Sequence, residues 1–218
     1  MKDKLNKIRE PEDVSKAVYI IGCVACIIAG CAVGVMVSWF NFLADNSTVW
    51  WQDIVGDLNL NVVFTKFPIW FLLGLAVAVW SGNPIKAAIN ELLFFVGVNF
   101  GILLAPKVFS GIGAQAGTMK WLLVGVIAAA LALVFWYAKS QSWPSIAFDA
   151  LIIGVLAAYC FDCGFVYFHF GDIVMDLINA IIIFLVVVVL ASGVIQFLVS
   201  LLGGAVIALI LGPVLQMS

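Results

Sequence analysis

The sequence predicts an all-α fold, a polytopic bundle of six or seven helices that span a membrane. Of the 218 residues, 65% are hydrophobic and only 10% are charged. The mean hydropathy of +1.21 lies far outside the range of soluble domains. The apolar runs reach the roughly 20 residues that one spanning helix needs. These runs are continuous, whereas the strands of a membrane barrel alternate apolar and polar residues, so helices are favoured.

The first sixteen residues differ from the rest of the chain. Residues 1–16 hold five of the ten basic residues and predict a charged, solvated tail. Residues 17–218 are then a single transmembrane helical domain. The first apolar run, about 17–43, is too long for a signal-peptide core and no small-residue cleavage pattern follows it, so we expect a retained span.

Further spans are expected at about 63–80, 86–105, 121–138 and 145–164. From Asp176 onward, about forty residues carry no formal charge, and as a helix they would reach roughly 60 Å, twice the hydrocarbon thickness. Two spans are therefore expected there, with a turn between Ser192 and Gly204. A six-span chain with a bent or re-entrant tail is the alternative.

The basic residues predict how the chain is oriented, because lysine and arginine favour loops that stay in the cytoplasm. With a cytoplasmic N-terminus, seven of the ten basic residues lie inside, and Lys66, Lys107 and Lys120 lie outside. We therefore expect the tail on the cytoplasmic side of a cell membrane. The lipid bilayer is then the first partner of the chain.

The segment CFDCGFVYFHFGDIVMD, residues 160–176, gathers two cysteines, three aspartates and the only histidine. The span map places it in an outward-facing hairpin, where Asp172 and Asp176 suit the start of a helix. Alternatively, Asp162, His169, Asp172 and Asp176 form a proton or cation site. Metal ligation by His169 and the last two aspartates would need one helical face, which Gly171 disfavours, so no metal site is expected.

The cysteines form two Cys-x-x-Cys pairs that the span map keeps apart. Cys23 and Cys26 lie in the inner half of the first span. Cys160 and Cys163 lie at the outer end of the fifth, where structural packing and an outward-facing redox pair are the two interpretations.

Small residues recur every four positions in several spans, which permits close contact between helices. The pattern predicts tight packing, either within the chain or between copies of it. Its members are Gly22, Cys26, Gly30 and Gly34 in the first span, Gly97 and Gly101 in the third, and Gly204, Ala208 and Gly212 near the C-terminus.

Polar residues inside the spans are the strongest functional candidates, because a charge near the bilayer centre costs about 2.5–3.5 kcal/mol on insertion scales. The third span begins at Asn83 and Pro84, a capping residue and a first-turn proline. Asn90, Glu91 and Asn99 follow within it, and Asp149 lies in the fifth span. Glu91 and Asp149 are expected to face one inner vestibule. Two roles remain possible for these residues: they form structural hydrogen bonds, or they line a transport pathway.

Two stretches of the sequence have a distinctive order of residues. They are Ser81-Gly-Asn-Pro-Ile-Lys-Ala-Ala-Ile-Asn90, and Trp136-Tyr-Ala-Lys-Ser-Gln-Ser-Trp143 followed by Ala150-Leu-Ile-Ile-Gly-Val155. Both resemble a group of small bacterial multi-span membrane proteins of unassigned function. The resemblance covers about residues 80–160. It implies a bacterial inner membrane and carries no activity or site residue.

Several function classes lack support in the sequence. There is no phosphate-binding loop, zinc-protease motif or serine-hydrolase elbow, so no cofactor is expected. A net charge of −2 without a basic cluster beyond the tail gives nucleic-acid binding no support.

Three function classes remain open. The sequence favours transport or channel activity for an ion or small solute, because several spans contain carboxyl and amide groups. A homo-oligomer is one form in which such a protein would act. A non-catalytic subunit of a membrane complex, such as the substrate-binding partner of a separate ATPase, is the alternative. A thiol oxidoreductase rests on Cys160 and Cys163 alone, so a non-enzymatic role is favoured.

Overall fold

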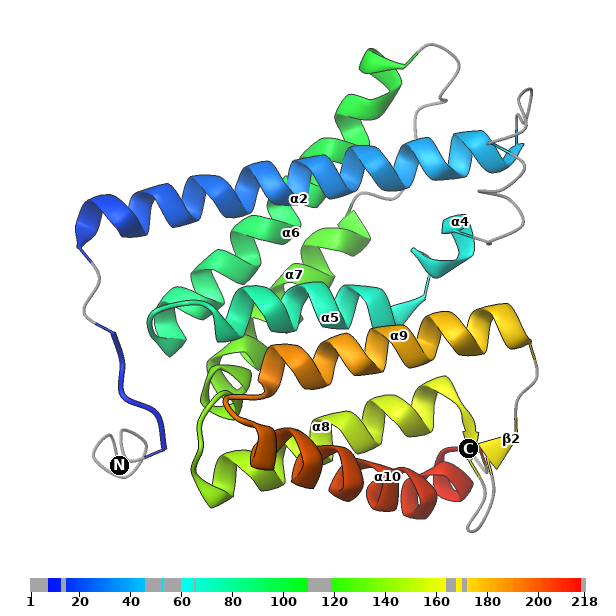
Figure 1. The fold of residues 1–218 in the computed structure, drawn as a ribbon. Coiled ribbons are helices and arrows are strands. Elements are labelled where there is room, and N and C mark those ends of the chain that lie inside the picture. The colour runs from blue at the N-terminus through cyan, green and yellow to red at the C-terminus, as the bar shows by residue number, and fades with distance from the viewer. Residues whose placement is uncertain are drawn as a thin grey trace. The chain divides into compact units, whose positions relative to one another are not determined.

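The structure is a computed structural model that describes residues 8–12, 15–45, 52, 60–64, 66–109, 119–163, 168–169 and 172–216. Its elements are α2 (Lys16–Asp45), α4 (Leu60–Val63), α5 (Phe67–Val79), α6 (Pro84–Val108), α7 (Met119–Phe135), the 3-10 helix η1 (Trp136–Ala138), α8 (Trp143–Cys160), β1 (Asp162–Cys163), β2 (Phe168–His169), α9 (Ile173–Leu190) and α10 (Val194–Gln216) (Figure 1). The predicted all-helical class is confirmed.

Six helices are long and apolar enough to cross a membrane: α2, α6, α7 extended through η1, α8, α9 and α10. The chain is thus a multi-pass membrane protein. The two spans expected after Asp176 are present, with their turn at residues 191–193. The span expected at 63–80 is shorter, because α5 has only 13 residues. Pro68 explains its start, since proline fits only the first turn of a helix.

The chain divides into two compact units, which we describe separately. Unit 1 comprises Met1–Glu10, Phe67–Val79 and Phe135–Ser218, and unit 2 comprises Pro11–Lys66 and Trp80–Val134. Unit 1 therefore holds α5, α8, α9 and α10, and unit 2 holds α2, α4, α6 and α7. The expected charged tail at residues 1–16 and single membrane domain at 17–218 stay a prediction.

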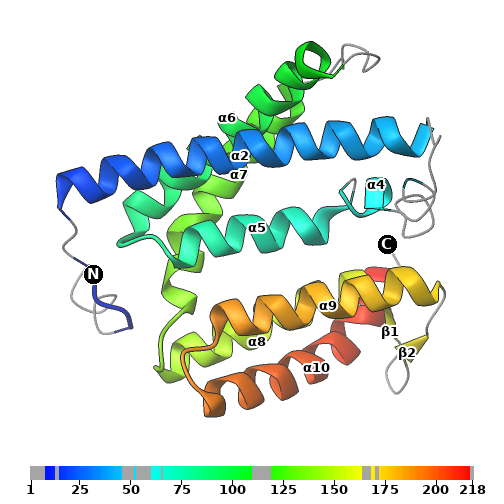
Figure 2. The same cartoon turned by 45° about the horizontal axis from the view of Figure 1, so that its top comes forward.

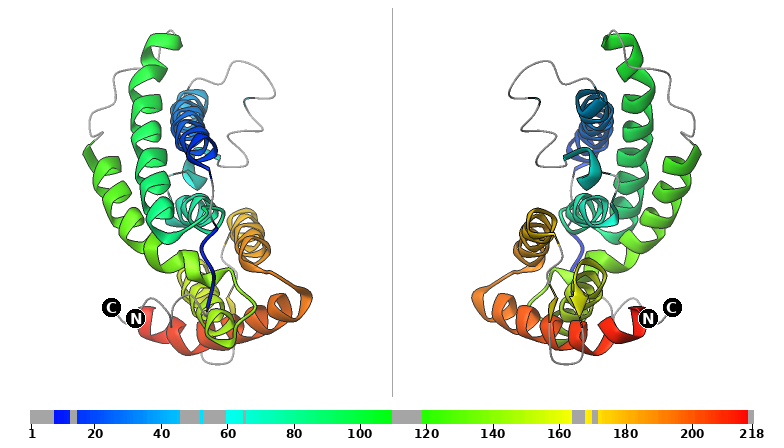
Figure 3. Two further views of the ribbon diagram at one scale, coloured as in Figure 1. Left: turned by 90° about the vertical axis from the view of Figure 1, so that its left-hand side faces the viewer. Right: turned by 90° about the vertical axis from the view of Figure 1, so that its right-hand side faces the viewer.

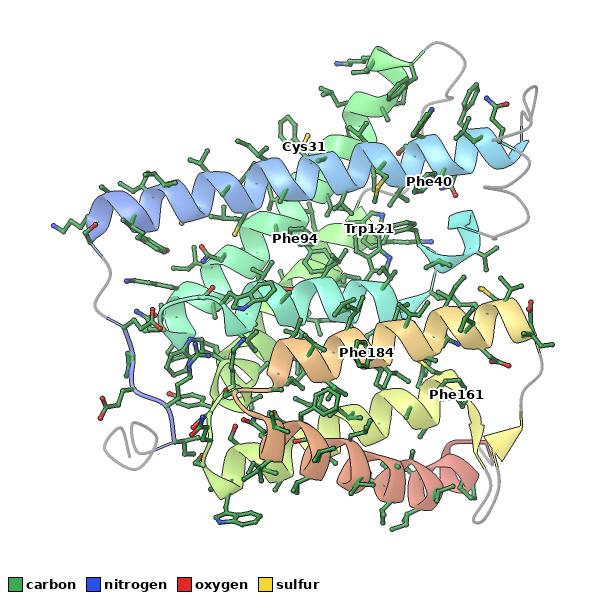
Figure 4. All side chains as sticks on the ribbon, in the orientation of Figure 1. Cys31, Phe40, Phe94, Trp121, Phe161 and Phe184 are labelled. Atoms are coloured by element: carbon green, nitrogen blue, oxygen red, sulfur yellow. The ribbon has the colours of Figure 1, made fainter. Side chains whose placement is uncertain are left out.

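Unit 2 is built on the contact between α2 and α6, which cross each other (Figures 1 and 3). Gly30 and Gly34 of α2 lie against the backbone of α6, and Gly97 and Gly101 of α6 lie against the backbone of α2. A Cβ atom at Gly30 would come within 2.0 Å of the Phe94 carbonyl oxygen. At Gly101 it would come within 2.1 Å of the Cys31 carbonyl oxygen; Cys31 and Phe94 are labelled in Figure 4. These four glycines therefore allow the close approach of α2 and α6 within the chain.

Unit 1 is built on a similar contact between α8 and α10, which lie side by side in two views (Figures 1 and 2). A Cβ atom at Gly154 would come within 2.5 Å of the Ile207 side chain and 2.9 Å of the Gly204 carbonyl oxygen. Ala208 is fully buried. The small residues near the C-terminus therefore pack α10 against α8.

Helices α9 and α5 complete unit 1. The ring of Phe184 in α9, labelled in Figure 4, meets the ring of Phe197 in α10 with centroids 6.1 Å apart. Helix α5 contacts α9, and the Phe67 ring at its start meets the edge of Tyr159 in α8 at 5.6 Å. Aromatic side chains thus hold the outer helices of this unit together.

The helix expected at 145–164 ends early, at Cys160. Its continuation forms β1, which pairs antiparallel with β2 in the register Asp162 to His169 and Cys163 to Phe168. The segment that carries His169 is therefore extended. His169, Asp172 and Asp176 therefore do not share a helical face. This agrees with the expectation from Gly171, which disfavours an unbroken helix there.

Candidate functional site: carboxyl groups buried in the spans

The side chain of Asp149 lies completely inside unit 1. It has 0% exposure, and Asp149 Oδ2 accepts a hydrogen bond from Gln196 Nε2 of α10 at 2.5 Å. Asp149 Oδ1 is buried without a hydrogen-bond partner among the described residues. Ser200, one helical turn after Gln196, is 2% exposed and its Oγ also lacks a partner. A polar cluster therefore joins α8 and α10 within an otherwise apolar contact.

Local structure fixes the depth of Asp149. Helix α8 begins at Trp143 and carries Pro144 in its first turn, which prevents the helix from starting earlier. Ser145 Oγ donates to the carbonyl oxygen of Ala138 and accepts from the Ser140 backbone N–H at 3.0 Å, closing the turn before the helix. Asp149 follows six residues after the helix start, about 9 Å along the axis. The carboxyl group thus lies within the span, more than one helical turn from its N-terminal end.

The residues beside this end of α8 form a dense hydrogen-bond network. Gln141 Nε2 donates to the Ser192 carbonyl oxygen at 3.1 Å, and the Ser192 backbone N–H donates to Gln196 Oε1 at 3.0 Å. The amide oxygen of Gln196 thus accepts from the backbone just before α10, as the side chain in a capping box does. The amide nitrogen donates to Asp149. The two bonds fix its side chain in one orientation.

A cleft of about 470 Å³ opens at the same end of unit 1. It is lined by Gln141, Trp143, Ile146 and residues 193–196. Gln196 contributes to the cleft and also contacts the Asp149 carboxyl. This residue therefore lies between the cleft and the buried acid.

Lys139 and Arg9 supply positive charge at this end of unit 1. Lys139 Nζ donates to the Val189 carbonyl oxygen at 3.0 Å. The Arg9 guanidinium donates to the Trp136 carbonyl oxygen at 2.8 Å and lies 4.3 Å from the centre of the Trp136 ring. Burial lowers the pKa of Lys139, and the positive charge of Arg9 lowers it further. Both cations thus donate hydrogen bonds to backbone carbonyl oxygens at the end of the spans.

Unit 2 holds a second buried acid, Glu91 in α6. It is 1% exposed, and its Oε2 has no hydrogen-bond partner in the described part of the chain. Asn83 caps α6 by accepting from the Lys86 backbone N–H at 2.8 Å, which places Glu91 seven residues, about 10 Å, after the start at Pro84. The depth expected from the sequence is therefore found.

The amides of α6 differ in their contacts. Asn90 Nδ2 donates to Ser81 Oγ at 3.0 Å, and Asn90 Oδ1 accepts from Cys23 Sγ of α2 at 3.4 Å. Asn90 thus has structural partners. Asn99 is buried and its Oδ1 has none among the described residues.

The candidates of the outer segment lie at the opposite end of α8 from the Asp149 cluster. Asp172 caps α9, accepting from the backbone N–H groups of Val174 at 3.0 Å and Met175 at 3.4 Å, and Asp176 lies in the first turn. This is the helix start that the sequence predicts. The side chains of Asp162, Cys163 and His169 lie outside the described residues, and Cys160 is half-buried at the end of α8. The redox and outer ion-site hypotheses stay predictions.

The candidates are only partly brought together by the fold. Glu91, Asn90 and Asn99 belong to unit 2 and Asp149 to unit 1, so the shared vestibule stays a prediction. Gln196 and Ser200 were not among the sequence candidates. Their signal is visible, since they are polar residues four positions apart, on one helical face, in an apolar run.

Among the described residues no group of three histidine, cysteine, aspartate or glutamate side chains lies close enough to hold a metal ion.

The remaining source of functional information is similarity to known proteins. The resemblance over residues 80–160 stays a prediction. Comparison with protein-family models, with curated proteins and with solved structures gives no match.

Proposed function

We propose that this chain is a membrane transport protein, of the transporter or channel type, that moves an ion or a small solute. The observation that carries the proposal is the carboxyl group of Asp149, which is fully buried within a span while its Oδ1 has no hydrogen-bond partner among the described residues. Ionisable groups at this depth are costly and, where they occur, mark ion and proton pathways.

A purely structural role explains the site less well. A buried polar pair is generally replaceable by well-packed apolar residues at little cost, so stability alone does not require an acid here. A structural carboxyl would also be expected to use both oxygens, since a buried polar atom without a partner costs about 1–3 kcal/mol. In the described part of the chain Asp149 Oδ2 accepts from Gln196, whereas Oδ1 has no bond of good hydrogen-bond geometry, although the Ser200 hydroxyl lies near the carboxyl group. This incompletely bonded oxygen supports a role in binding an ion.

Glu91 supports the same proposal independently, because its side chain is 1% exposed and its Oε2 has no partner among the described residues. A chain that buries two carboxyl side chains to 1% exposure or less, in two different helices, fits a transport protein better than a passive anchor. By the same proposal the chain acts in a bacterial cytoplasmic membrane, which the resemblance over residues 80–160 supports.

Ion flux into liposomes tests the proposal. Purified wild-type protein, Asp149→Asn and Glu91→Gln would be reconstituted, and proton, sodium and potassium fluxes followed with indicator dyes under imposed gradients. Wild-type vesicles should pass at least one of these ions faster than protein-free vesicles, and Asp149→Asn should return that flux to the protein-free level. Gly22→Ala, where the added Cβ atom meets nothing within 4 Å, is the control and should behave as wild type.

Two results would contradict ion transport. One is a wild-type flux of all three ions equal to that of empty vesicles. The other is an unchanged flux in both carboxyl variants, given that size-exclusion chromatography and circular dichroism show them folded.

A further inference from the structure

Asp149 lies in a cluster with Gln196 and Ser200 of α10. Its carboxyl group is 0% exposed, Gln196 Nε2 donates to Oδ2 at 2.5 Å, and the Ser200 hydroxyl lies near the carboxyl group. Asp149 Oδ1 and Ser200 Oγ are both buried without a bond of good hydrogen-bond geometry in the described structure. A serine hydroxyl can donate to a carboxylate or accept from a carboxylic acid, so Ser200 can bond to Oδ1 in the charged form and in the neutral form of Asp149.

The charges around Asp149 favour this neutral form. Helix α10, packed against it, contains no charged residue, and the acids of α9, β1 and the α9 cap lie at the far end of α8. Lys139 and Arg9 each donate to a backbone carbonyl oxygen. The interactions found for the Asp149 carboxyl group within the described residues are with the neutral side chains of Gln196 and Ser200, and a buried carboxylate without a cationic partner is strongly disfavoured.

We propose that Asp149 is a proton-binding site that exchanges with water through the cleft, and that Gln196 is the positioning residue between the cleft and the carboxyl group. In the binding step a hydronium ion in the cleft transfers its proton to Oδ1 of the carboxylate, a new O–H bond forms, and a water molecule is left. Release is the reverse step. The inference rests on the proposed transport function and names the proton as the ion that the site of unit 1 takes.

A metal ion fits the same cluster poorly. Hard metal cations take about six oxygen ligands in proteins, whereas Asp149 Oδ1 and Ser200 Oγ are the two side-chain oxygens of this cluster that lack a partner among the described residues. Asp149 Oδ2 accepts from Gln196, and the Gln196 carbonyl oxygen accepts from Ser192. A proton requires one acceptor and one hydrogen-bond partner, which is what the cluster offers.

Gln196 has the contacts expected of a residue that controls access. It lines the cleft, yet it is only 3% exposed and bonds to both Ser192 and Asp149. Water that enters the cleft reaches the carboxyl group only when this amide turns away. Shortening Gln196 removes both bonds and opens the route.

Infrared spectroscopy of the full-length protein in lipid nanodiscs tests the proposal without any ion gradient. At about pH 7, wild type should show the C=O band of a protonated carboxylic acid, and Asp149→Asn should lose one component of that band. Glu91→Gln, which changes the other unit, should keep the component. If Asp149→Asn does not fold, isotopic labelling of aspartate in wild-type protein gives the same assignment, because the component then shifts.

Hydrogen–deuterium exchange of the carboxyl proton tests the route. The band should exchange about ten-fold faster in Gln196→Ala than in wild type, the factor expected when a hydrogen bond of about 1.4 kcal/mol is lost. Glu91→Gln, which alters the other unit, should leave the exchange rate of the Asp149 band unchanged.

Each contrary result overturns a stated part of the inference. Absence of the Asp149 band at about pH 7, or its loss when sodium replaces choline at constant pH, would overturn the proton site. Equal exchange rates in Gln196→Ala and wild type would overturn the route. A protonated Asp149 in a chain without flux would refute the transport proposal alone, whereas flux without the band would refute only the proton site.

Discussion

Alanine at Gly34 should weaken the contact between α2 and α6 in unit 2. The new Cβ atom would lie 2.1 Å from the Val98 carbonyl oxygen and 3.0 Å from the Ile102 backbone nitrogen. Ordinary contact begins at 3.4 Å, so the first distance is about 1.3 Å too short. Both neighbours are backbone atoms and neither can rotate away. The helices must therefore separate.

The size of the effect follows from two opposing terms. Overpacking of a close contact costs about 1–3 kcal/mol, and alanine returns about 0.5–1 kcal/mol because it is the better helix former. We expect Gly34→Ala to lose about 1–2 kcal/mol of unfolding free energy. Gly22→Ala is the matched control in the same helix, because a Cβ atom there meets nothing within 4 Å. It should be neutral or stabilising by up to about 1 kcal/mol.

Reversible unfolding in mixed micelles, with increasing sodium dodecyl sulfate and followed by circular dichroism, measures both variants against wild type. The two substitutions add the same methyl group to the same helix, so a difference in their midpoints reports the contact and not the helix propensity. A Gly34→Ala variant as stable as Gly22→Ala would refute the close approach of α2 and α6.

The ends of unit 1 give two more predictions. Asp172→Ala removes the α9 cap and should cost about 0.5–2 kcal/mol of unfolding free energy, whereas Asp172→Asn keeps an accepting oxygen and should cost less. Hydrogen exchange of the backbone amides in the first turn of α9 measures both effects. Equal exchange rates in Asp172→Ala and wild type would contradict the cap. Arg9→Gln removes the positive charge near Lys139 and should raise the lowered pKa of that amine. Acylation of Lys139, which only the neutral amine undergoes, should then begin at a higher pH, with Arg9→Lys as the control that keeps the charge. An unchanged acylation profile in Arg9→Gln would show that burial alone lowers the pKa.

The spans and their depths were predictable because they depend on local sequence. Helix α6 starts at the proline that follows the expected cap, and the uncharged tail folds into two helices, α9 and α10. The exception is α5, because the apolar run predicts one helix over 63–80, whereas Pro68 favours a start at Phe67.

The partners of the buried groups were not predictable, because they depend on which helices meet. The period-four glycines of α2 are plain in the sequence, but their spacing does not say that α6 is the helix they face. Gln196 and Ser200 are 47 and 51 positions from Asp149. No local pattern links them to that acid, and only the packing of α10 on α8 brings them together.

The two units place their acids by the same local means. Helices α6 and α8 each begin with a polar residue and a proline in the first turn, continue to a buried acid, and reach a glycine that packs on another helix. The residues are Asn83, Pro84, Glu91 and Gly97 in α6, and Ser142, Pro144, Asp149 and Gly154 in α8.

This common order has a physical consequence for both carboxyl groups. The proline fixes where the helix starts, so it sets the depth of the acid, and the glycine lets a second helix approach closely enough to exclude water. The two acids nevertheless differ in partners, since Asp149 has Gln196 while Glu91 Oε2 has none in the described structure. What the units share is therefore a carboxyl group held about 10 Å inside a span, a property that packing does not need and that ion binding does.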